Sequence, residues 1–354
     1  MAIFNRLFKK FSKDVGIDLG TANTLIYVKE RGIVVKESSI VALNNRTDQI
    51  LAVGEEAARM VGKTPPHITI SRPLVDGIIS DFEVTEKMLK YFIDRIYQES
   101  FGLSPRPRVV IGVPLDVTEV EKKAVEDVVL SAGAREVYLV ENVIATAIGA
   151  RLPIQDPSGN MIVDLGGGVT EIAVISLSGV VAWKSLRTAG NKLNQDVMQF
   201  ARSEFNLLIG EGVAEDIKIK AAKIIESGEP IELKMRGRDL LTGLPKEVII
   251  NAEQVKAALQ RSVLTIIEGI KSTLEITPPE LVADIYQRGM VLAGGGALLA
   301  GLDQAIAKAT KIPIKVIEDP ITCAVRGMGL ILEDENLLKE VAIPSSTQEE
   351  KNSR

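Results

Sequence analysis

The pattern of apolar and polar residues predicts short strands alternating with helices along the whole chain. Strands are indicated where apolar residues run together or alternate with polar ones, as in 108–113 and 178–186. Helices are indicated where apolar residues recur every three or four positions, as in 85–99, 193–205 and 253–274. A mixture of this kind is typical of an α/β protein.

One stretch near the middle organises the chain. An apolar strand ends in Asp164, the glycines 166–168 follow, and a second strand runs from 172 to 176. Consecutive glycines leave the turn without side chains, so backbone N–H groups can approach an anion closely. Asp164 faces the same space, and a carboxylate beside a phosphate requires a cation between them. The stretch therefore predicts a phosphate site with a divalent metal, Mg²⁺.

The same plan occurs near the start of the chain. Residues 16–24 contain an apolar strand, Asp18, a leucine, a glycine and a short polar turn, and a second strand follows over 25–29. A third glycine run, 294–296, follows an apolar strand and leads into a helix around 303–309, a geometry in which the backbone can approach a ligand. Two Asp-Leu-Gly hairpins suggest two related halves that face one nucleotide. The alternative is that the three glycine turns are unrelated.

The composition is that of an ordinary globular protein. The chain has 354 residues, enough for two domains, and 46% of them are hydrophobic and 25% charged. The single cysteine, Cys323, excludes an internal disulfide framework, and the single histidine, His67, excludes a poly-histidine metal site. The net charge of −5 gives no broad basic surface for nucleic acid, and no apolar run is long enough to suggest a membrane-spanning helix.

The first thirteen residues differ from the rest, because four are basic and none is acidic. The apolar residues that share one face of a helix there are Ile3, Phe4, Leu7, Phe8 and Phe11. A short basic helix with a phenylalanine-rich face is typical of an interfacial membrane anchor, since its cations suit anionic lipid. The alternative is a terminal helix that packs on its own core.

The three glycine motifs resemble those of the actin–Hsp70–sugar kinase superfamily. The longer runs 16–24, 236–245, 277–281 and 294–299 are similar to the MreB family of bacterial actins, and the resemblance covers about residues 14 to 340. It implies a two-lobed actin-like ATPase fold, in which each lobe is an RNase H-like α/β core with a smaller inserted subdomain and ATP binds in the cleft.

The resemblance also implies the division of the chain and its role. The first lobe is expected at 14–152 with 326–343 returning to it, and the second at 153–325. A membrane-binding segment, 1–13, precedes them, and a disordered tail, 344–354, follows. The implied function is to form ATP-dependent filaments, paired antiparallel on the inner face of the cytoplasmic membrane. With membrane proteins of the cell-wall elongation machinery, these filaments would direct cell-wall synthesis and cell shape.

The resemblance further assigns candidate nucleotide-binding residues. Those of the two phosphate loops are Thr21, Ala22, Asn23, Gly166, Gly167 and Gly168. Those near the nucleoside and in the last loop are Glu215, Asp216, Ile217, Lys218, Gly294, Gly295, Gly296 and Ala297. Asp18 and Asp164 are expected to hold Mg²⁺ through water molecules.

Two positions depart from the family pattern. The family usually has a glutamate where this chain has Asn142 and a threonine where it has Val169, and both lie near the attacking water. Asparagine can orient water but cannot accept its proton as a carboxylate would, and valine does neither. The departures predict slow rather than absent ATP hydrolysis. Glu141 is an alternative base, although one residue of shift at a strand–helix junction changes a side chain's direction.

Other functions stay open at this point. A small-molecule kinase of the same superfamily would need a carboxylate base for the acceptor hydroxyl, and no further motif supplies one. An Hsp70-like chaperone would need a substrate-binding domain, for which the chain leaves no room after the nucleotide core. A paralogous actin-like filament protein with a different cellular role, and a preference for GTP over ATP, also stay open.

Overall fold

The computed structural model describes residues 14–98, 106–227 and 232–344. The chain divides into two compact units: unit 1 comprises residues 1–157, 175–180 and 322–354, and unit 2 comprises residues 158–174 and 181–321. The sequence placed the first boundary after residue 152 and the return to the first part at 326.

Unit 1 is built on a six-stranded mixed sheet with the order β19-β10-β9-β1-β2-β3. The strands are β1 (Val15–Leu19), β2 (Asn23–Val28), β3 (Gly32–Ser38), β9 (Arg108–Val113), β10 (Glu136–Glu141) and β19 (Ala342–Ile343). β1, β9 and β10 are parallel, whereas β2 and β3 continue the sheet as antiparallel neighbours. The central strands are almost continuously apolar, as expected for strands that are covered on both faces.

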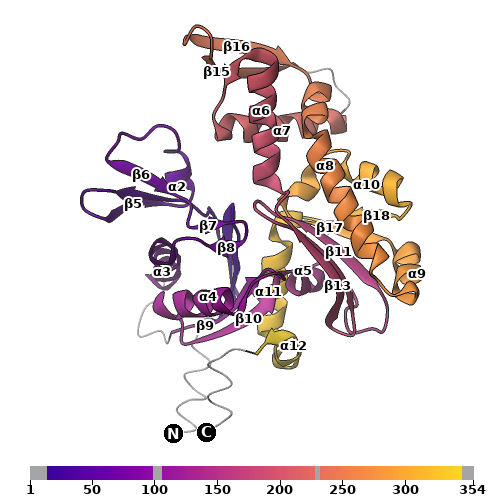
Figure 1. Ribbon diagram of the computed structural model, residues 1–354. Coiled ribbons are helices and arrows are strands. Elements are labelled where there is room, and N and C mark those ends of the chain that lie inside the picture. The colour runs from indigo at the N-terminus through magenta and orange to yellow at the C-terminus, as the bar shows by residue number, and fades with distance from the viewer. Residues whose placement is uncertain (1–13, 99–105, 228–231, 345–354) are drawn as a thin grey trace. The chain divides into compact units, whose positions relative to one another are not determined.

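Helices pack on both faces of this sheet (Figure 1). On one face, α3 (Phe82–Gln98) and α4 (Glu119–Ser131) share an apolar cluster with Ile17, Ile111 and Leu139. On the other face, α5 (Asn142–Gly149) and α11 (Cys323–Glu333) pack, and Gly16 approaches Met328 of α11. Neighbouring residues of β1 therefore point to opposite layers, as the alternation of a strand requires. The short helix α12 (Glu335–Val341) leads into β19.

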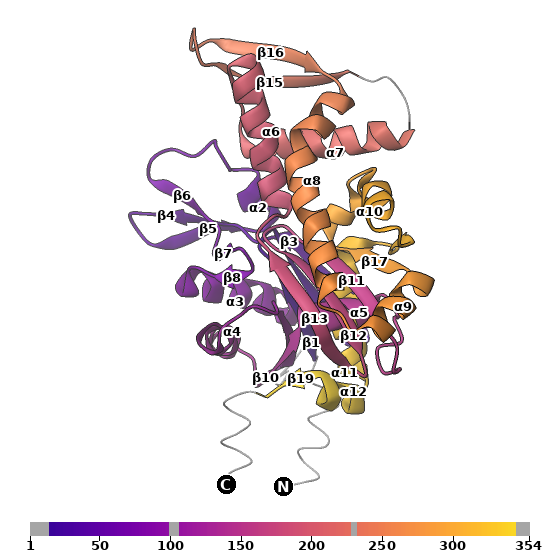
Figure 2. The ribbon, with the colours of Figure 1, turned by 45° about the vertical axis from the view of Figure 1, so that its right-hand side comes forward.

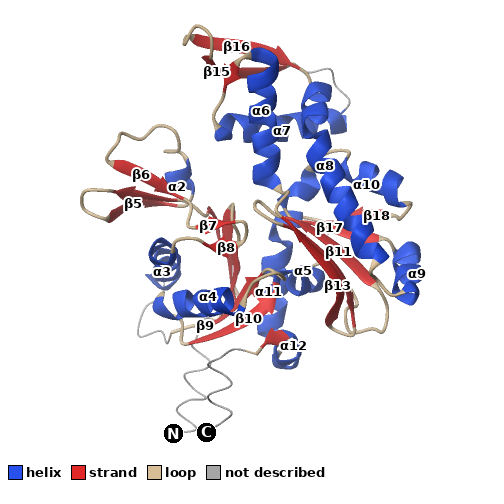
Figure 3. Cartoon of the chain, viewed as in Figure 1, coloured by secondary structure: helices blue, strands red, loops and turns tan. Residues whose placement is uncertain are grey.

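A smaller part of unit 1 is inserted between β3 and α3, and Figure 3 shows its strands beside a short helix. Its elements are β4 (Val41–Asn44), β5 (Gln49–Val53), α2 (Glu55–Ala58), β6 (Ile68–Ser71), β7 (Leu74–Val75) and β8 (Ile78–Ile79). Ile40, Ala42, Ala52 and Ala57 form a small core of its own. An inserted subdomain with a separate core is what the family resemblance implied for this lobe.

Unit 2 is organised around a five-stranded sheet with the order β13-β12-β11-β17-β18. The strands are β11 (Asn160–Leu165), β12 (Thr170–Ser176), β13 (Gly179–Leu186), β17 (Met290–Ala293) and β18 (Ile314–Val316). The long helix α8 (Ala252–Glu275) lies across this sheet (Figure 2) and buries Ile266 and Ile270 against Val163 and Val174. The other helical segments are α9 (Pro279–Arg288), η1 (Gly295–Leu298), α10 (Leu302–Thr310) and η2 (Pro320–Thr322).

A smaller part of unit 2 combines two helices with a three-stranded sheet. Its elements are α6 (Gly190–Phe205), β14 (Leu207–Leu208), α7 (Glu211–Ser227), β15 (Leu233–Asp239) and β16 (Pro245–Ile250). Val197 of α6, Ile217 of α7 and Met235 of β15 meet in its core. This core also takes in Leu259 of α8, so α8 joins the two parts of unit 2.

The run 236–245, one of those that carry the family resemblance, contains the turn between two strands. In the structure β15 and β16 both extend into it, because the Asp239 side chain closes a tighter turn. Its carboxylate pairs with Lys246 Nζ at 2.9 Å and accepts hydrogen bonds from the backbone N–H groups of Leu241 and Thr242. The Lys246 ammonium and these N–H groups lower the pKa of Asp239 to about 2. The charge that closes the turn therefore persists well into the acid range.

The helices α5 and α11 of unit 1 cross at glycines. A Cβ atom on Gly327 would overlap the carbonyl oxygen of Ala145, and one on Gly149 would overlap that of Cys323. Backbones can approach this closely only where neither helix carries a side chain. The crossing therefore fixes α11 against α5.

Replacing Gly327 by alanine is expected to lower the free energy of unfolding by about 2 kcal/mol, because the new Cβ meets the backbone of α5. Gly212 in α7 is the matched control, since a Cβ there meets nothing within 4 Å. Gly212→Ala is expected to leave stability unchanged or to raise it by up to about 1 kcal/mol. Urea unfolding followed by circular dichroism measures both, and equal effects would contradict the close crossing.

Candidate functional site

The two Asp-Leu-Gly hairpins close in the same way. In the first, Gly20 N–H donates to Asn23 O at 3.1 Å, and in the second, Gly166 N–H donates to Val169 O at 2.9 Å. A Cβ on Gly20 would stand 2.8 Å from Asn23 O, and one on Gly166 would stand 2.9 Å from Val169 O. Both turns are thus shaped by backbone alone, which is how loops that bind anions through N–H groups are built.

A buried threonine follows each turn and fixes its exit. Thr24 is fully buried, its hydroxyl lies 2.9 Å from Ser39 Oγ, and Ser39 donates to Gly20 O at 2.6 Å. Thr170 is also fully buried and donates to Thr188 O at 2.8 Å. Each strand after the turn is therefore tied to a second segment.

Thr21, a predicted phosphate-loop residue, is held from the inserted part of unit 1. Gly77 N–H donates to Thr21 Oγ1 at 2.8 Å. Gly77 lies in the tight turn between β7 and β8, where Asp76 and Gly77 have φ values of 51° and 81°. Asp-Gly is a favoured pair for such a turn. Since Thr21 Oγ1 accepts this bond, its own hydrogen is directed elsewhere and can donate to an anion.

The third glycine run packs directly on the second hairpin. β17 pairs with β11 in parallel and places Ala293 beside Asp164. A Cβ on Gly294 would overlap Leu165 O and stand 2.5 Å from Asp164 Oδ1, and Gly294 has a φ of 76°. The structure therefore brings Asp164 together with 294–296. The helix predicted around 303–309 is present as α10, which begins at Leu302, and η1, which contains Gly295 and Gly296, precedes it.

The residues expected near the nucleoside lie on α7, one turn inside the helix, which begins at Glu211. Lys218 Nζ lies 2.9 Å from Glu215 Oε2 and 3.3 Å from Gly190 O. The other two predicted residues point elsewhere. Ile217 is buried in the apolar core, and Asp216 forms an exposed ion pair with Lys220.

The start of α6 links these residues to the glycine turn. Gly190 N–H donates to Gly166 O at 3.1 Å, and Asn191 N–H donates to Gly167 O at 2.8 Å. On the same helix, Asn194 Nδ2 donates to Glu215 Oε2 at 2.7 Å. No local motif in the sequence marks Asn194, since its partner lies on another helix.

The donor set suits Mg²⁺ that is bound through water and phosphate. Asp18 and Asp164 each lie in the last two residues of a strand. In residues 14–98, 106–227 and 232–344 no group of three or more His, Cys, Asp or Glu side chains is arranged to hold a metal. Mg²⁺ typically keeps several waters and takes one or two carboxylates plus substrate phosphates, so the single carboxylate beside each turn is of a kind that suits it.

Asn142 and Glu141 point to opposite faces of the unit 1 sheet. The Asn142 side chain lies over Gly112, and its Oδ1 is buried without a hydrogen-bond partner among the described residues. Glu141 follows Leu139 on the α4 face, where burial raises its pKa and the charge of Lys122 opposes the rise. The change of direction that the sequence analysis anticipated at this junction is therefore present.

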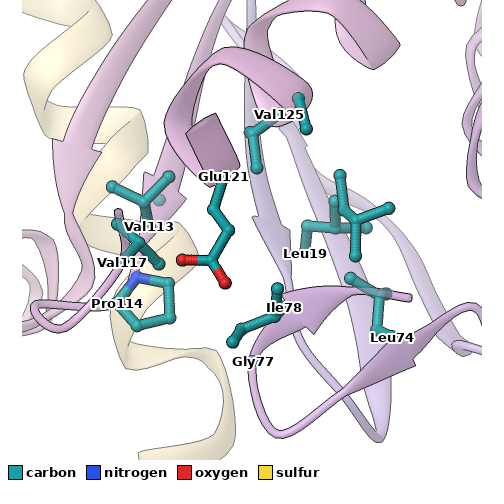
Figure 4. Close-up of a pocket in the computed structure, with 12 residues that line it drawn as sticks. Leu19, Leu74, Gly77, Ile78, Val113, Pro114, Val117, Glu121 and Val125 are labelled. Carbon is teal, nitrogen blue, oxygen red and sulfur yellow. The ribbon is translucent and has the colours of Figure 1, made fainter. Parts of the chain in front are cut away.

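A small cavity lies beside the first hairpin in unit 1 (Figure 4). Leu19, Leu74, Val113 and Val125 contribute apolar walls, and Glu121 is its one charged lining residue among those described. Figure 4 shows the Glu121 carboxylate between Pro114 and Ile78, and it accepts hydrogen bonds from Thr118. The volume is about 20 Å³, room for about one water molecule, so this cavity is far too small for a nucleotide.

The predicted membrane residues Ile3, Phe4, Leu7, Phe8 and Phe11 lie outside the described residues, as does most of the predicted tail. Within the described ranges, no helix combines the length and the apolar character that crossing a bilayer requires.

Comparison with known proteins decides the family. A family model described as "MreB/Mbl protein" matches residues 12–340. The chain belongs to the MreB/Mbl family. The predicted resemblance to MreB is thereby confirmed.

Curated relatives match over nearly their full length. The chain is 48% identical over 324 residues to the cell shape-determining protein Mbl of Bacillus subtilis, covering 92% of this chain and 97% of that protein. It is 46% identical over 327 residues to the cell shape-determining protein MreB of Escherichia coli K12, covering 91% and 94%. Both relatives are named for determining cell shape.

Solved structures confirm the predicted actin-like fold. MreB5 of Spiroplasma citri bound to ADP superposes with a TM-score of 0.87 at 34% identity, covering 93% of this chain and 98% of that one. The same protein has also been solved bound to AMPPNP. A MamK chain from a double helical filament gives a TM-score of 0.74 at 23% identity, covering 90% and 98%, and shows the fold alone.

Replacing Gly294 by alanine is expected to cost at least about 3 kcal/mol of unfolding free energy, because its Cβ would overlap Leu165 O in a backbone conformation that favours glycine. Gly301 is the matched control, since its φ of 78° is similar but a Cβ there meets nothing within 4 Å. Gly301→Ala is expected to cost only about 1 kcal/mol. Urea unfolding compares the two, and equal losses would argue against the close packing of the third glycine run on the second hairpin.

Proposed function

We propose that this chain is an ATP-binding cytoskeletal protein that assembles into membrane-associated actin-like filaments and directs cell shape and cell-wall synthesis. The observation that carries the proposal is the matched pair of glycine hairpins, closed by the same backbone hydrogen bond. Membership of the MreB/Mbl family supports it, since relatives that match over nearly their full length are named cell shape-determining proteins.

The nucleotide is ATP with Mg²⁺. Residues 21–23 and 166–168 bind its phosphates through backbone N–H groups and the Thr21 hydroxyl, while Asp18 and Asp164 hold Mg²⁺ through water. Glu215, Lys218 and the glycines 294–296 contact the nucleoside. Support comes from the hydrogen bonds that join these segments within unit 2 and from the ADP and AMPPNP in the Spiroplasma citri protein.

Hydrolysis is slow, because the two positions near the attacking water lack the usual groups. The side-chain oxygen Oδ1 of Asn142 is buried over Gly112, and the Val169 side chain is apolar and 8% exposed. Neither side chain accepts a proton from water, a step that typically contributes about 100-fold or more to rate. ATP binding thus sets the polymerising conformation, and hydrolysis only times disassembly.

The filament lies on the inner face of the cytoplasmic membrane. Ile3, Phe4, Leu7, Phe8 and Phe11 insert as the apolar face of a basic helix, and pairs of filaments run antiparallel. Membrane proteins of the cell-wall elongation machinery are the partners. Support comes from the charge pattern of the first thirteen residues, in which four are basic and none is acidic.

Phosphate released per polymerised subunit tests the hydrolysis proposal. Purified protein with MgATP and anionic vesicles is expected to polymerise while releasing well below one phosphate per subunit over minutes. Asn142→Glu combined with Val169→Thr is expected to raise the release rate about tenfold to 100-fold, because a carboxylate can accept the proton of water.

Val181→Thr is the control, because it replaces a valine by threonine in β13, where the side chain is 44% exposed. It is expected to leave the rate of phosphate release unchanged. Rapid release by the parent protein would mean that another group, such as Glu141, orients the water. Absence of ordered polymer would contradict the filament proposal itself.

Sedimentation with lipid vesicles tests the membrane anchor. Phe4→Ser combined with Phe8→Ser is expected to reduce binding to anionic vesicles about tenfold or more, because each buried phenylalanine contributes roughly 1.5–3 kcal/mol. Phe82→Ser, at a phenylalanine that is 40% exposed in α3, is the matched control and is expected to bind like the parent. Parent-like binding of the double variant would favour a terminal helix that packs on its own core.

A further inference from the structure

Asn194 is a buried polar residue on α6 with an incomplete set of hydrogen bonds. It is 3% exposed. Its Nδ2 donates to Glu215 Oε2 at 2.7 Å, while its Oδ1 is buried and has no hydrogen-bond partner among the described residues. Leaving a buried amide oxygen unsatisfied costs stability. The hydrogen bond that the Asn194 amide nitrogen donates to Glu215 is therefore the interaction that this buried side chain contributes.

Glu215 receives two side-chain hydrogen bonds on the same oxygen. Lys218 Nζ joins Asn194 Nδ2 at Oε2, at 2.9 Å. The two donors fix the orientation of the carboxylate, and Oε1 is the oxygen left for the donors of a ligand. The Glu215 side chain is 44% exposed and Lys218 is 11% exposed, so a buried support presents the carboxylate to solvent.

The same support reaches the glycine turn of unit 2. Lys218 Nζ lies 3.3 Å from Gly190 O, and Gly190 N–H donates to Gly166 O at 3.1 Å. Asn194 follows Gly190 by one helical turn and so lies on the same side of α6. Asn194, Glu215 and Lys218 are thus connected to the turn proposed to hold the phosphates.

We propose that Asn194 is a positioning residue of the nucleotide site: its amide holds the Glu215 carboxylate so that Oε1 accepts hydrogen bonds from the hydroxyl or amino groups of the nucleoside. The role rests on the proposed binding of ATP. An amide suits this place because it donates to the carboxylate at any physiological pH. A carboxyl group would repel Glu215 unless the two shared a proton.

Asn194→Asp turns this role into a pH-dependent affinity. Two carboxyl groups at hydrogen-bond distance raise the pKa of one of them, so the bridge survives below that raised pKa and is lost as the pH rises through it. Calorimetry gives the affinity of each protein for ADP. The ratio of the variant's affinity to the parent's is expected to fall about tenfold or more between about pH 5 and pH 8. Inorganic tripolyphosphate, which has no nucleoside, is expected to bind both proteins equally.

Gln195→Glu is the matched control, because it adds the same charge to an exposed position of the same helix. Its affinity ratio is expected to stay flat with pH. Glu215 of α7 bonds Asn194, and Lys218 of α7 bonds Glu215. The charged neighbours along α6 are Lys192 and Asp196, which pair with each other, and Ser262 of α8 donates to Asp196. All are present in the parent protein, so their titration cancels in the ratio.

A pH-independent loss of affinity for both ADP and tripolyphosphate would reveal a packing role and overturn the proposal, as would unchanged ADP affinity at every pH. A parent protein that binds neither ADP nor ATP would instead overturn the proposed function, and this role with it. If Asn194→Asp does not fold, Glu215→Gln is added. The amide of residue 215 then donates to the carboxylate of residue 194, so the hydrogen bond between the two positions is restored in the opposite direction. In that double variant residues 194 and 215 are no longer both carboxyl groups and an oriented oxygen remains at Oε1, so its ADP affinity relative to the parent is expected to stay flat with pH. An affinity ratio that still falls between about pH 5 and pH 8 would refute the positioning role.

Discussion

The site depends on a space that no side chain can occupy. In each Asp-Leu-Gly hairpin the glycine N–H donates to the carbonyl three residues on, and that carbonyl oxygen stands less than 3 Å from where a Cβ would be. Only glycine closes such a turn without shifting the strands. The closure also sets the register in which Asp18 and Asp164 lie near their strand ends. The turns use different residues, Thr-Ala-Asn and Gly-Gly-Val, so backbone geometry and not side-chain identity defines both.

The two units hold their turns by different means. Unit 1 uses hydroxyl groups, since Ser39 bonds the first turn and Thr21 accepts from Gly77 N–H. Unit 2 adds backbone contacts to the hydrogen bond from the Thr170 hydroxyl, since Gly190 N–H donates to Gly166 O and Gly294 packs on Leu165 O. Hydroxyls can rotate and change partners, whereas packed backbone cannot without moving a helix or a strand. The first turn is therefore the more adaptable of the two.

Local interactions made much of this predictable from the sequence. The hairpins close through bonds between residues three apart, and α4 begins with a capping box formed by Thr118 and Glu121, which are also three apart. Prediction from the sequence pattern fails where a side chain shapes a turn or bonds a residue on another element. Asp239 shortens the loop between β15 and β16, and Asn194 meets a residue on another helix. Ile217 faces the core because α7 begins at Glu211. Glycines stand on both sides of Glu211, so the sequence does not mark this helix start clearly.

In the proposed function, nucleotide binding and ATP hydrolysis use different parts of the chain. Substitutions can therefore affect one without affecting the other. The phosphate turns are held by N–H and C=O groups that every residue carries, so they keep their geometry as long as the glycines remain. In the proposed function, activation of water depends on the chemistry of single side chains, and the positions proposed for it are Asn142 and Val169. The buried Asn142 oxygen and the apolar Val169 leave the hairpin bonds intact. In the proposed function the chain therefore keeps a nucleotide-dependent conformation while it hydrolyses ATP slowly, and substitutions at these two positions would change the lifetime of the bound nucleotide without changing the turns.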